Sequence, residues 1–266
     1  MAEQTDNLIE VRDLVVKYGP KTVIDGVSFH VRRGEVFVIL GGSGSGKTTL
    51  LRTLVGLKQP ASGRILIRGE DFTSMSDEQR IELRKNIGMC FQGSALLKSL
   101  SLADNVALPL REHTKLEEST IDIMTKIKLE LVGLGGFEDY LPSELSGGMK
   151  KRAGIARAMA MDPEFIFYDE PSAGLDPIVA AGIDQLIRKM QSTFKLTSVV
   201  VTHEMESVKL IADRVCMLES GRVVGIGTLE ELELSEHPYV QQFFARRPDD
   251  EESSDSAYAK ALTGLQ

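Results

Sequence analysis

A glycine-rich run near the N-terminus contains the residue types that bind the phosphates of a nucleotide. Residues 41–48 read Gly-Gly-Ser-Gly-Ser-Gly-Lys-Thr and fit the pattern G-x-x-x-x-G-K-[ST] at every fixed position. The glycines leave backbone N–H groups exposed to a polyphosphate, Lys47 supplies a point charge for the β- and γ-phosphates, and the Thr48 hydroxyl suits a Mg²⁺ ion. The expected nucleotide contacts are Gly41, Gly42, Ser43, Gly44, Ser45, Gly46, Lys47, Thr48 and Thr49.

A second group of candidate residues follows an apolar stretch in the C-terminal half of the chain. Residues 165–168 are Phe-Ile-Phe-Tyr, and Asp169 and Glu170 come directly after them. Ligands bind α/β sheets at the carboxyl ends of the strands, which makes Asp169 a candidate Mg²⁺ carboxylate. Glu170 would then lie near the γ-phosphate without being used by the metal. The alternative for this acid pair is a solvated turn before Pro171.

The third element is Leu-Ser-Gly-Gly-Met at residues 145–149, which we call the signature. A helical pattern follows it, so Ser146 is expected at or near the N-cap, with the unpaired amides of Gly147 and Gly148 behind it. Such a helix end attracts anions. Taken alone, the stretch fits an ordinary capped helix equally well. Its position between the phosphate loop and the strand before Asp169 favours the anion-binding role.

The three elements together resemble the nucleotide-binding subunits of ABC transporters, over residues 8–245 of this chain. The resemblance implies an ATPase with ATP and Mg²⁺ as cofactors. It also implies a homodimer, because in that family the signature of one subunit closes the ATP site of the other. The fifth signature residue is usually Gln in the family, whereas this chain has Met149. That change removes a side-chain donor and acceptor but leaves the backbone amides in place.

The same resemblance implies roles for individual residues. Glu170 would polarise the attacking water, Gln92 would sense Mg²⁺ and face a membrane partner, and His203 would sense the γ-phosphate. Asp176, in Ala-Gly-Leu-Asp at 173–176, resembles the loop between subunits, and Tyr18 resembles the aromatic residue that stacks on adenine. The alternative for His203 is a histidine with a purely structural role, and the alternative for Tyr18 is an ordinary surface tyrosine in a turn. The implied catalytic residues are Lys47, Glu170 and His203, and the implied metal ligands are Thr48, Gln92 and Asp169.

The elements expected around these residues are those of an α/β P-loop NTPase with a RecA-like core. Two β-rich segments, 8–16 and 23–31, are joined by turn residues and predict an antiparallel flap. A strand at 36–40 runs into the phosphate loop and a helix over 47–57. Alternating strands and helices after residue 162 predict a parallel sheet. The strands are expected at 165–168, 198–202 and 214–218, and the helices at 177–193 and 205–212.

Helical spacing replaces this alternation between residues 94 and 161, which predicts an inserted subdomain. Apolar residues stand at helical spacing over 102–110 and then at Ile121, Met124, Ile127, Leu131 and Leu134. The predicted organisation is a single ABC ATPase domain, 1–245, followed by an acidic and polar tail, 246–266. The domain comprises an α/β core with a flap (1–93 and 162–228), the helical signature subdomain (94–161) and a C-terminal helical piece (229–245). The resemblance favours a contact of residues 237–266 with the second subunit, and the alternative is that Tyr239, Phe243 and Phe244 pack on the protein's own core.

Composition and charge exclude several other classes of protein. The chain has 266 residues, 42% of them hydrophobic, and a formal charge of −8, which argues against a general nucleic-acid binder. Local basic clusters such as residues 150–152 are candidate docking points. Cys90 and Cys216 lie in apolar segments without metal-type spacing and are interpreted as reduced core thiols. No run approaches the roughly 18 apolar residues of a membrane span, and the acidic start is unlike a signal peptide. The chain is therefore expected in the cytoplasm, with any translocation path in a separate permease.

Three strings give a finer resemblance within the family, to the ATPases of bacterial Mla phospholipid-transport systems. They are residues 91–96, 109–114 and 141–144. This resemblance implies a peripheral protein at the cytoplasmic face of the inner membrane. Its partners would be an integral-membrane permease, a small STAS-domain subunit and an MCE-domain lipid-binding protein.

Three other functions, and one structural alternative for the glycine-rich loop, can be compared with phospholipid transport. The ATPase of another ABC importer or exporter would carry the same motifs. A soluble ABC ATPase of ribosomes or DNA ends would usually have two nucleotide modules or a long coiled coil, for which this chain lacks room. A P-loop small-molecule kinase would leave Ser146 to Gly148 and His203 unexplained. The simplest alternative, a flexible glycine linker at 41–48, does not fit the apolar strand before it and the helix-forming residues after it.

Overall fold

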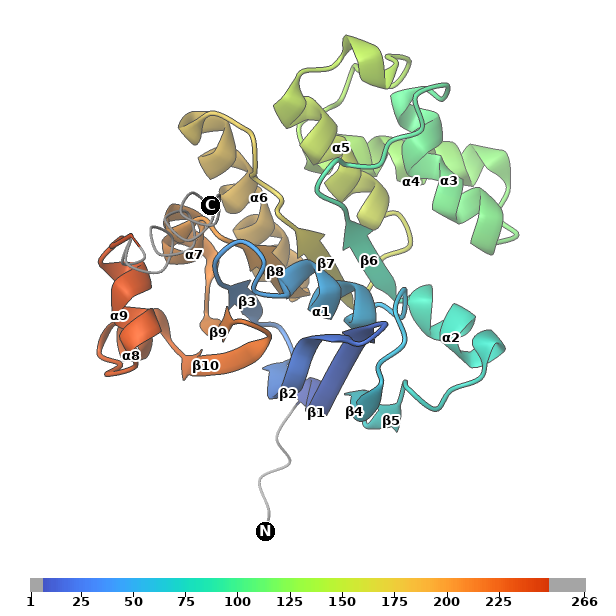
Figure 1. Cartoon of the computed structure of the whole chain (residues 1–266). Coiled ribbons are helices and arrows are strands. Elements are labelled where there is room, and N and C mark those ends of the chain that lie inside the picture. The colour runs from blue at the N-terminus through green and yellow to red at the C-terminus, as the bar shows by residue number, and fades with distance from the viewer. Residues whose placement is uncertain (1–6, 249–266) are drawn as a thin grey trace, which may run out of the picture.

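The computed structural model describes residues 7–248, which form two sheets and the helices around them (Figure 1). The strands are β1 (Asn7–Tyr18), β2 (Lys21–Arg32), β3 (Val36–Leu40), β4 (Ser62–Ile67), β5 (Glu70–Asp71), β6 (Ile87–Cys90), β7 (Phe165–Asp169), β8 (Thr197–Thr202), β9 (Arg214–Glu219) and β10 (Arg222–Gly227). The helices are α1 (Lys47–Leu54), α2 (Asp77–Arg84), α3 (Leu102–His113), α4 (Glu118–Leu131), the short 3₁₀ helix η1 (Pro142–Glu144), α5 (Gly147–Ala158), α6 (Pro177–Phe194), α7 (Met205–Ile211), α8 (Leu229–Glu233) and α9 (Pro238–Phe244).

The larger sheet has six strands in the order β10-β9-β3-β8-β7-β6. Five of them run parallel, and β10 pairs antiparallel with β9 at one edge. Strands β3, β7 and β8 are buried along their whole length, as expected of parallel strands covered on both faces. Leu40 pairs with Thr202 and Asp169 pairs with Val201, so the segments that follow β3, β7 and β8 meet at one edge of the sheet.

The smaller sheet is the antiparallel flap, with the order β2-β1-β4-β5. It packs over α1, whose Leu50, Leu51 and Leu54 join the flap and one face of the larger sheet in a shared core. Helix α1 ends at Leu54, three residues earlier than the expected end at Leu57. Gly56 has φ +74°, a left-handed conformation that stops a helix, and the prediction missed this glycine as a terminator.

Helices α3, α4 and α5 lie together beside the larger sheet, at the upper right of Figure 1. Ser101 and Ser146 cap α3 and α5 with their hydroxyls, which satisfies amides at both helix starts. Two of the five residues at helical spacing do not belong to the buried face of α4. Ile127 is 51% exposed, and Leu134 lies beyond the end of α4, although it is buried. The helical group exists as a packed unit, while the division of the chain into domains stays a prediction.

The C-terminal part of the described chain packs on the protein's own core. Val240 of α9 is fully buried, and Tyr239, Phe243 and Phe244 pack against the larger core cluster. These contacts fit the alternative in which the aromatic residues pack on the protein's own core, and a contact of residues 237–266 with a second subunit stays a prediction. Residues 249–266, which hold the rest of the predicted tail, lie outside the described residues.

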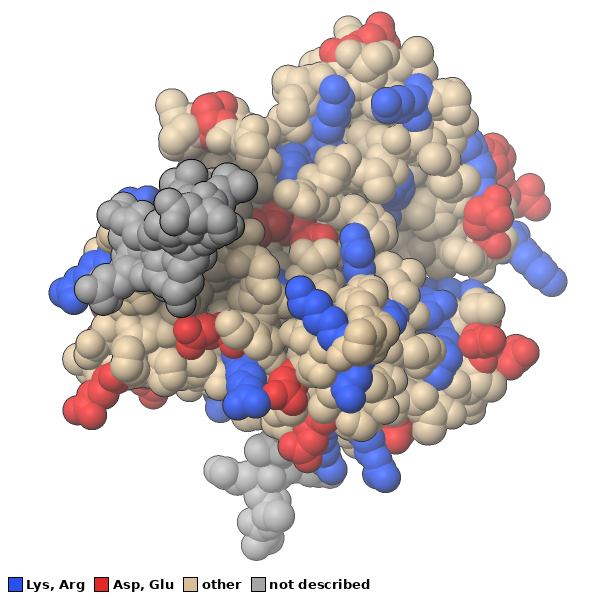
Figure 2. Space-filling view, in the orientation of Figure 1, with Lys and Arg blue, Asp and Glu red and all other residues tan. Residues whose placement is uncertain are grey.

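The two cysteines are core thiols, as expected from the sequence. Cys90 and Cys216 are both buried and unpaired, and burial raises the pKa of the Cys90 thiol to about 11. Figure 2 shows basic and acidic side chains interspersed over the visible face. Within residues 7–248, no helix combines the length and the hydropathy needed to span a bilayer.

Candidate functional site

The phosphate loop connects β3 to α1 and is held tightly by its own lysine. Lys47 Nζ donates to the carbonyl oxygens of Gly41 and Gly42 at 2.8 and 2.9 Å. Two positions of the loop require glycine. A Cβ at Gly41 would lie 2.3 Å from the Leu218 carbonyl oxygen, and Gly46 has φ +102°. The loop is thus a built structure rather than a flexible linker.

The loop forms one wall of a cavity of about 520 Å³. Nine of the 18 expected site residues line it, from the loop, from the segment after β6 and from the segments after β7 and β8. The lining residues are Val23, Ser43, Gly44, Gly46, Lys47, Thr48, Thr49, Gln92, Glu170 and His203. Burial is the main cause that lowers the pKa of Lys47, while the nearby Glu170 and Asp169 charges oppose it. The cavity therefore combines backbone amides, one buried cation and a carboxylate.

Asp169 is the last residue of β7 and Glu170 follows it, and each of these two side chains has an oxygen that lacks a protein partner. Asp169 is 7% exposed and Glu170 is 8% exposed. Glu170 Oε1 lies 2.8 Å from His203 Nδ1, whereas Glu170 Oε2 and Asp169 Oδ1 are buried and unpaired. Burial raises the pKa of Asp169, and the Glu170 charge raises it further. Buried carboxylate oxygens without partners are costly, so this corner is suited to a ligand that satisfies them.

The donor set in this corner fits a magnesium ion. A hydroxyl (Thr48), an amide (Gln92) and a carboxylate (Asp169) are hard oxygen ligands, and Mg²⁺ usually takes one or two carboxylates together with phosphate oxygens and water. The buried, unpaired Asp169 Oδ1 is the observation that supports this fit. Within the described residues there is no cluster of three His, Cys, Asp or Glu that would hold a metal without the nucleotide.

The signature lies outside this cavity. Ser146 Oγ accepts from the Met149 N–H at 3.3 Å and so caps α5. A Cβ on Gly147 would meet Leu175 at 3.3 Å, and one on Gly148 would meet Val179 at 2.5 Å. The signature of this chain therefore packs beside the start of α6 instead of facing its own phosphate loop.

Two further expected site residues are also outside the cavity. Tyr18 is 44% exposed at the turn between β1 and β2, and Lys58 Nζ lies 4.4 Å from the centre of its ring. Asp176 caps α6 by accepting from the N–H groups of Ile178 and Val179, both at 3.1 Å. Neither Tyr18 nor Asp176 lines the cavity that the phosphate loop of the same chain lines.

A buried polar network behind the site was missed by the sequence analysis. Ser207 donates to Asp184 Oδ2 at 2.8 Å, and the Ser172 and Ser207 hydroxyls are 3.1 Å apart. Ser172 follows Glu170 by two residues and Ser207 follows His203 by four, so the network joins the segments after β7 and β8 to α6. A lone Asp inside an apolar helix face was the signal in the sequence. Burial raises the pKa of Asp184 to about 6.

This raised pKa predicts a pH dependence of stability. The folded state binds the Asp184 proton more tightly than the unfolded state, whose value is 3.8. The resulting stabilisation is complete below pH 3.8 and is lost as the pH rises through about 6. Asp184→Asn should therefore gain stability relative to the wild type between pH 4 and 7, by on the order of 3 kcal/mol. Urea unfolding over this range measures it, with exposed Asp122→Asn as control. A constant difference across the range would contradict the assignment.

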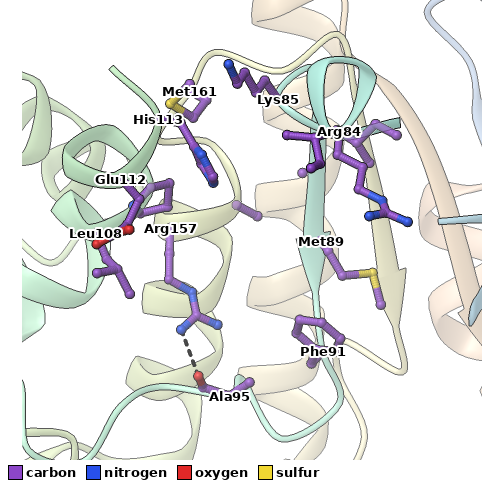
Figure 3. A pocket seen from close by; sticks show the side chains of 15 residues that line it. Arg84, Lys85, Met89, Phe91, Ala95, Leu108, Glu112, His113, Arg157 and Met161 are labelled. Carbon is purple, nitrogen blue, oxygen red and sulfur yellow. Dashed lines mark hydrogen bonds between the residues drawn. The ribbon is translucent and has the colours of Figure 1, made fainter. Parts of the chain in front are cut away.

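A separate groove of about 590 Å³ lies between the core and the helical group (Figure 3). Its lining is mainly apolar, with Arg84, Arg157, Glu112 and His113 at its sides. Arg157 donates to the Ala95 carbonyl oxygen at 2.7 Å, drawn as a dashed line, and to the Ser94 carbonyl oxygen at 2.7 Å. The remaining lining residues are Ile81, Lys85, Ile87, Gly88, Met89, Phe91, Leu108, Pro109, Ala158 and Met161.

The fold and the phosphate site together define a nucleotide-binding cassette. A family profile described as "ABC transporter" matches residues 24–173. The chain belongs to the ABC transporter family and is one of its ATP-binding, ATP-hydrolysing subunits. This confirms the α/β P-loop fold and the ATPase class expected from the sequence.

Individual proteins similar to this chain give more detail than the family profile. The chain is 44% identical over 243 residues to the intermembrane phospholipid transport system ATP-binding protein MlaF of Haemophilus influenzae, covering 91% of this chain and 92% of MlaF. It is 43% identical to the probable ribonucleotide transport ATP-binding protein mkl of Mycobacterium leprae, covering 90% of this chain and 69% of mkl. A dimeric ATP-binding cassette in a post-hydrolysis state, bound to ADP and Pi, is 29% identical with a TM-score of 0.76, covering 83% of this chain and 98% of that one.

Proposed function

We propose that this subunit powers the movement of phospholipid between the two membranes of a Gram-negative envelope, which maintains outer-membrane lipid asymmetry. The observation that carries the proposal is the end-to-end match with MlaF, which spans 91% of this chain and 92% of that one. The match with mkl has a similar identity but spans only 69% of that protein. Ribonucleotide or other transport is therefore the second candidate, to be separated from the first by experiment.

ATP would bind with its phosphates in the cavity beside the loop. The amides of residues 42–48 and Lys47 would hold the β- and γ-phosphates, and Lys47 would exchange the Gly41 and Gly42 carbonyls for phosphate oxygens. Mg²⁺, when bound by Thr48, Gln92 and Asp169, would neutralise phosphate charge. Tyr18 is proposed to stack on the adenine.

Hydrolysis would depend on Glu170 and His203. Phosphoryl transfer needs positioning and charge neutralisation more than covalent chemistry. Glu170 lines the cavity and would accept a proton of the attacking water, while its Oε1 is oriented by His203 Nδ1 at 2.8 Å. His203 lines the same cavity and is 55% exposed, so it could also contact the γ-phosphate.

The active unit is proposed to be a homodimer. The cavity contains no group from the signature of the same chain, and the start of α5, which is a helix end of the kind that attracts anions, lies outside it. In a dimer, Ser146 to Gly148 of one copy would close the ATP site of the other, with the Asp176 segment between the subunits. The related cassette of known structure is dimeric, which supports this arrangement.

The membrane partners would attach to this dimer at the cytoplasmic face of the inner membrane. We assign the groove between α2, β6, α3 and α5 to a segment of a separate permease, because it begins beside Gln92 and has an apolar floor. A small STAS-domain subunit and an MCE-domain lipid-binding protein would complete the assembly. Nucleic acid is not proposed as a partner, since the chain carries a formal charge of −8.

Affinity purification from native membranes in mild detergent tests this assembly. The tagged wild type is expected to recover a polytopic permease with STAS- and MCE-domain subunits and bound phospholipid. Ile81→Glu, which places a charge in the groove, should lose the permease but keep ATP hydrolysis by the isolated subunit. The control is Ile226→Glu, at an exposed apolar position outside the groove. Recovery of a different permease would redirect the substrate, and ribosomal or chromosomal partners alone would contradict transport.

A further inference from the structure

A buried lysine on the signature helix contacts two elements of the catalytic cavity. Lys151 lies in α5 and is 7% exposed. Its Nζ donates to the carbonyl oxygen of Gln92 at 2.6 Å and to the carbonyl oxygen of Glu170 at 2.9 Å. One ammonium group therefore joins the helical group, the segment after β6 and the segment after β7. The two neighbouring basic residues are placed differently from Lys151. Lys150 is half-buried, and Arg152 donates to the Val132 carbonyl oxygen.

Lys151 is buried, so it is not available as one of the candidate docking points at residues 150–152. A buried ammonium costs several kcal/mol unless hydrogen bonds and opposite charges compensate. Burial is the largest cause that lowers the pKa of Lys151, and the nearby Glu170 and Asp169 charges oppose it. An apolar side chain would fill the same space without this cost. The cation therefore has a use that packing alone does not explain.

The backbone of Glu170 shows what this contact holds. Glu170 has φ +49°, the left-handed region that a residue with a side chain adopts at a cost of roughly 1–3 kcal/mol. Its N–H donates to the Val201 carbonyl oxygen at 2.9 Å, and its own carbonyl accepts from Lys151. These two hydrogen bonds hold the peptide groups on either side of the Glu170 Cα. The direction of the carboxylate toward His203 depends on that conformation.

We propose that Lys151 is a positioning residue, which holds the Glu170 backbone and the Gln92 segment against the signature helix and so keeps the Glu170 carboxylate aimed at the attacking water. Because Lys151 belongs to the same helix as Ser146, a shift of α5 when the signature meets the partner's nucleotide would move both carbonyls. The inference rests on the proposed catalytic role of Glu170. It concerns hydrolysis and not ATP binding, since Lys151 does not line the cavity.

The test compares steady-state ATP hydrolysis in matched variants. Lys151→Met keeps the length of the side chain and removes the donors, and it should lower kcat about tenfold to a hundredfold, the cost of an error of up to about 1 Å in position. KM for ATP should stay within about threefold, because the phosphate loop is unchanged. Lys151→Arg keeps the charge and the donors and should restore most of kcat.

The control is an equally buried lysine of the same helical group. Lys128 is also 7% exposed, but it pairs with Asp162 and contacts no residue of the cavity. Lys128→Met should lower the melting temperature and leave kcat unchanged. If Lys151→Met does not fold, Lys151→Ala replaces it, because the space it leaves admits water to the two carbonyls.

The outcomes separate this inference from the proposed function. A folded Lys151 variant with wild-type kcat, a parallel loss in Lys128→Met, or a rise in KM that accounts for the whole loss would overturn the role of Lys151. Glu170→Gln is measured in the same assay. If it hydrolyses ATP normally, the role of Glu170 is wrong and the Lys151 inference fails with it. If it is inactive while Lys151→Met is normal, only the Lys151 inference fails.

Discussion

Glu170→Gln is expected to retain ATP binding and to lose nearly all ATP turnover. The amide has the shape of the carboxylate and leaves Lys47 and the proposed Mg²⁺ ligands in place, but it cannot accept a proton from water. A positioned general base contributes roughly 10²- to 10⁴-fold, so kcat should fall by about that factor. Phosphate release measures turnover, and binding of a fluorescent ATP analogue measures affinity.

The control for this prediction is a neighbouring acid without a place in the cavity. Glu206 lies on α7, where it pairs with Lys209 at 2.9 Å and its side chain is 84% exposed. Glu206→Gln should hydrolyse ATP at the wild-type rate. Normal phosphate release by Glu170→Gln would show that another group orients the water, and loss of ATP binding would show that the variant disturbs the loop.

Ser146→Arg should abolish hydrolysis by preventing closure of the dimer. The arginine places bulk and charge at the helix start that is proposed to meet the partner's nucleotide, and it removes the cap on α5. Loss of the cap alone costs about 1 kcal/mol, which a folded domain survives. The expected result is a folded chain that binds ATP as a monomer and releases phosphate at least about a hundredfold more slowly, the factor typical of losing one donor to a reacting group.

Mixing experiments make this prediction specific for a site shared between copies. Ser146→Arg mixed with Lys47→Ala can form one intact site, from the loop of the first copy and the signature of the second. Activity should therefore return on mixing. A chain with both changes, mixed with wild type, forms no such site in the heterodimer. Ser143→Arg, at the exposed 3₁₀ turn before the signature, is the matched control. Wild-type activity of Ser146→Arg would contradict the shared site.

The strands of the core and the phosphate loop could be predicted from the sequence, because each depends on residues that are neighbours in the chain. The apolar runs of β3, β7 and β8 are long and fully buried, so their positions were predicted within one residue. Strand β10 was missed, because Gly225 and Gly227 give it the composition of a loop, and its pairing with β9 supplies the order that its residues lack. Ile127 stands at helical spacing, but the neighbours of α4 do not cover its side of the helix.

The contacts between distant segments could not be read from the chain. Lys151 lies 59 residues from Gln92 and 19 from Glu170, and in the sequence it belongs to a run of three basic residues. The Glu170 to His203 hydrogen bond likewise joins the ends of two strands, and only their pairing in the parallel sheet brings them within 2.8 Å. Motif spacing identifies the candidates, whereas tertiary packing decides which atoms meet.

The most direct test of the central claim is ATP-driven lipid movement by the reconstituted complex. The tagged subunit and its co-purified membrane partners are placed in liposomes, and the transfer of labelled phospholipid between these and acceptor liposomes is followed with ATP and Mg²⁺. The account predicts transfer with the wild type and none above background with Glu170→Gln in the same complex. Equal transfer by the two complexes, or ATP hydrolysis that moves a different solute and no phospholipid, would contradict it.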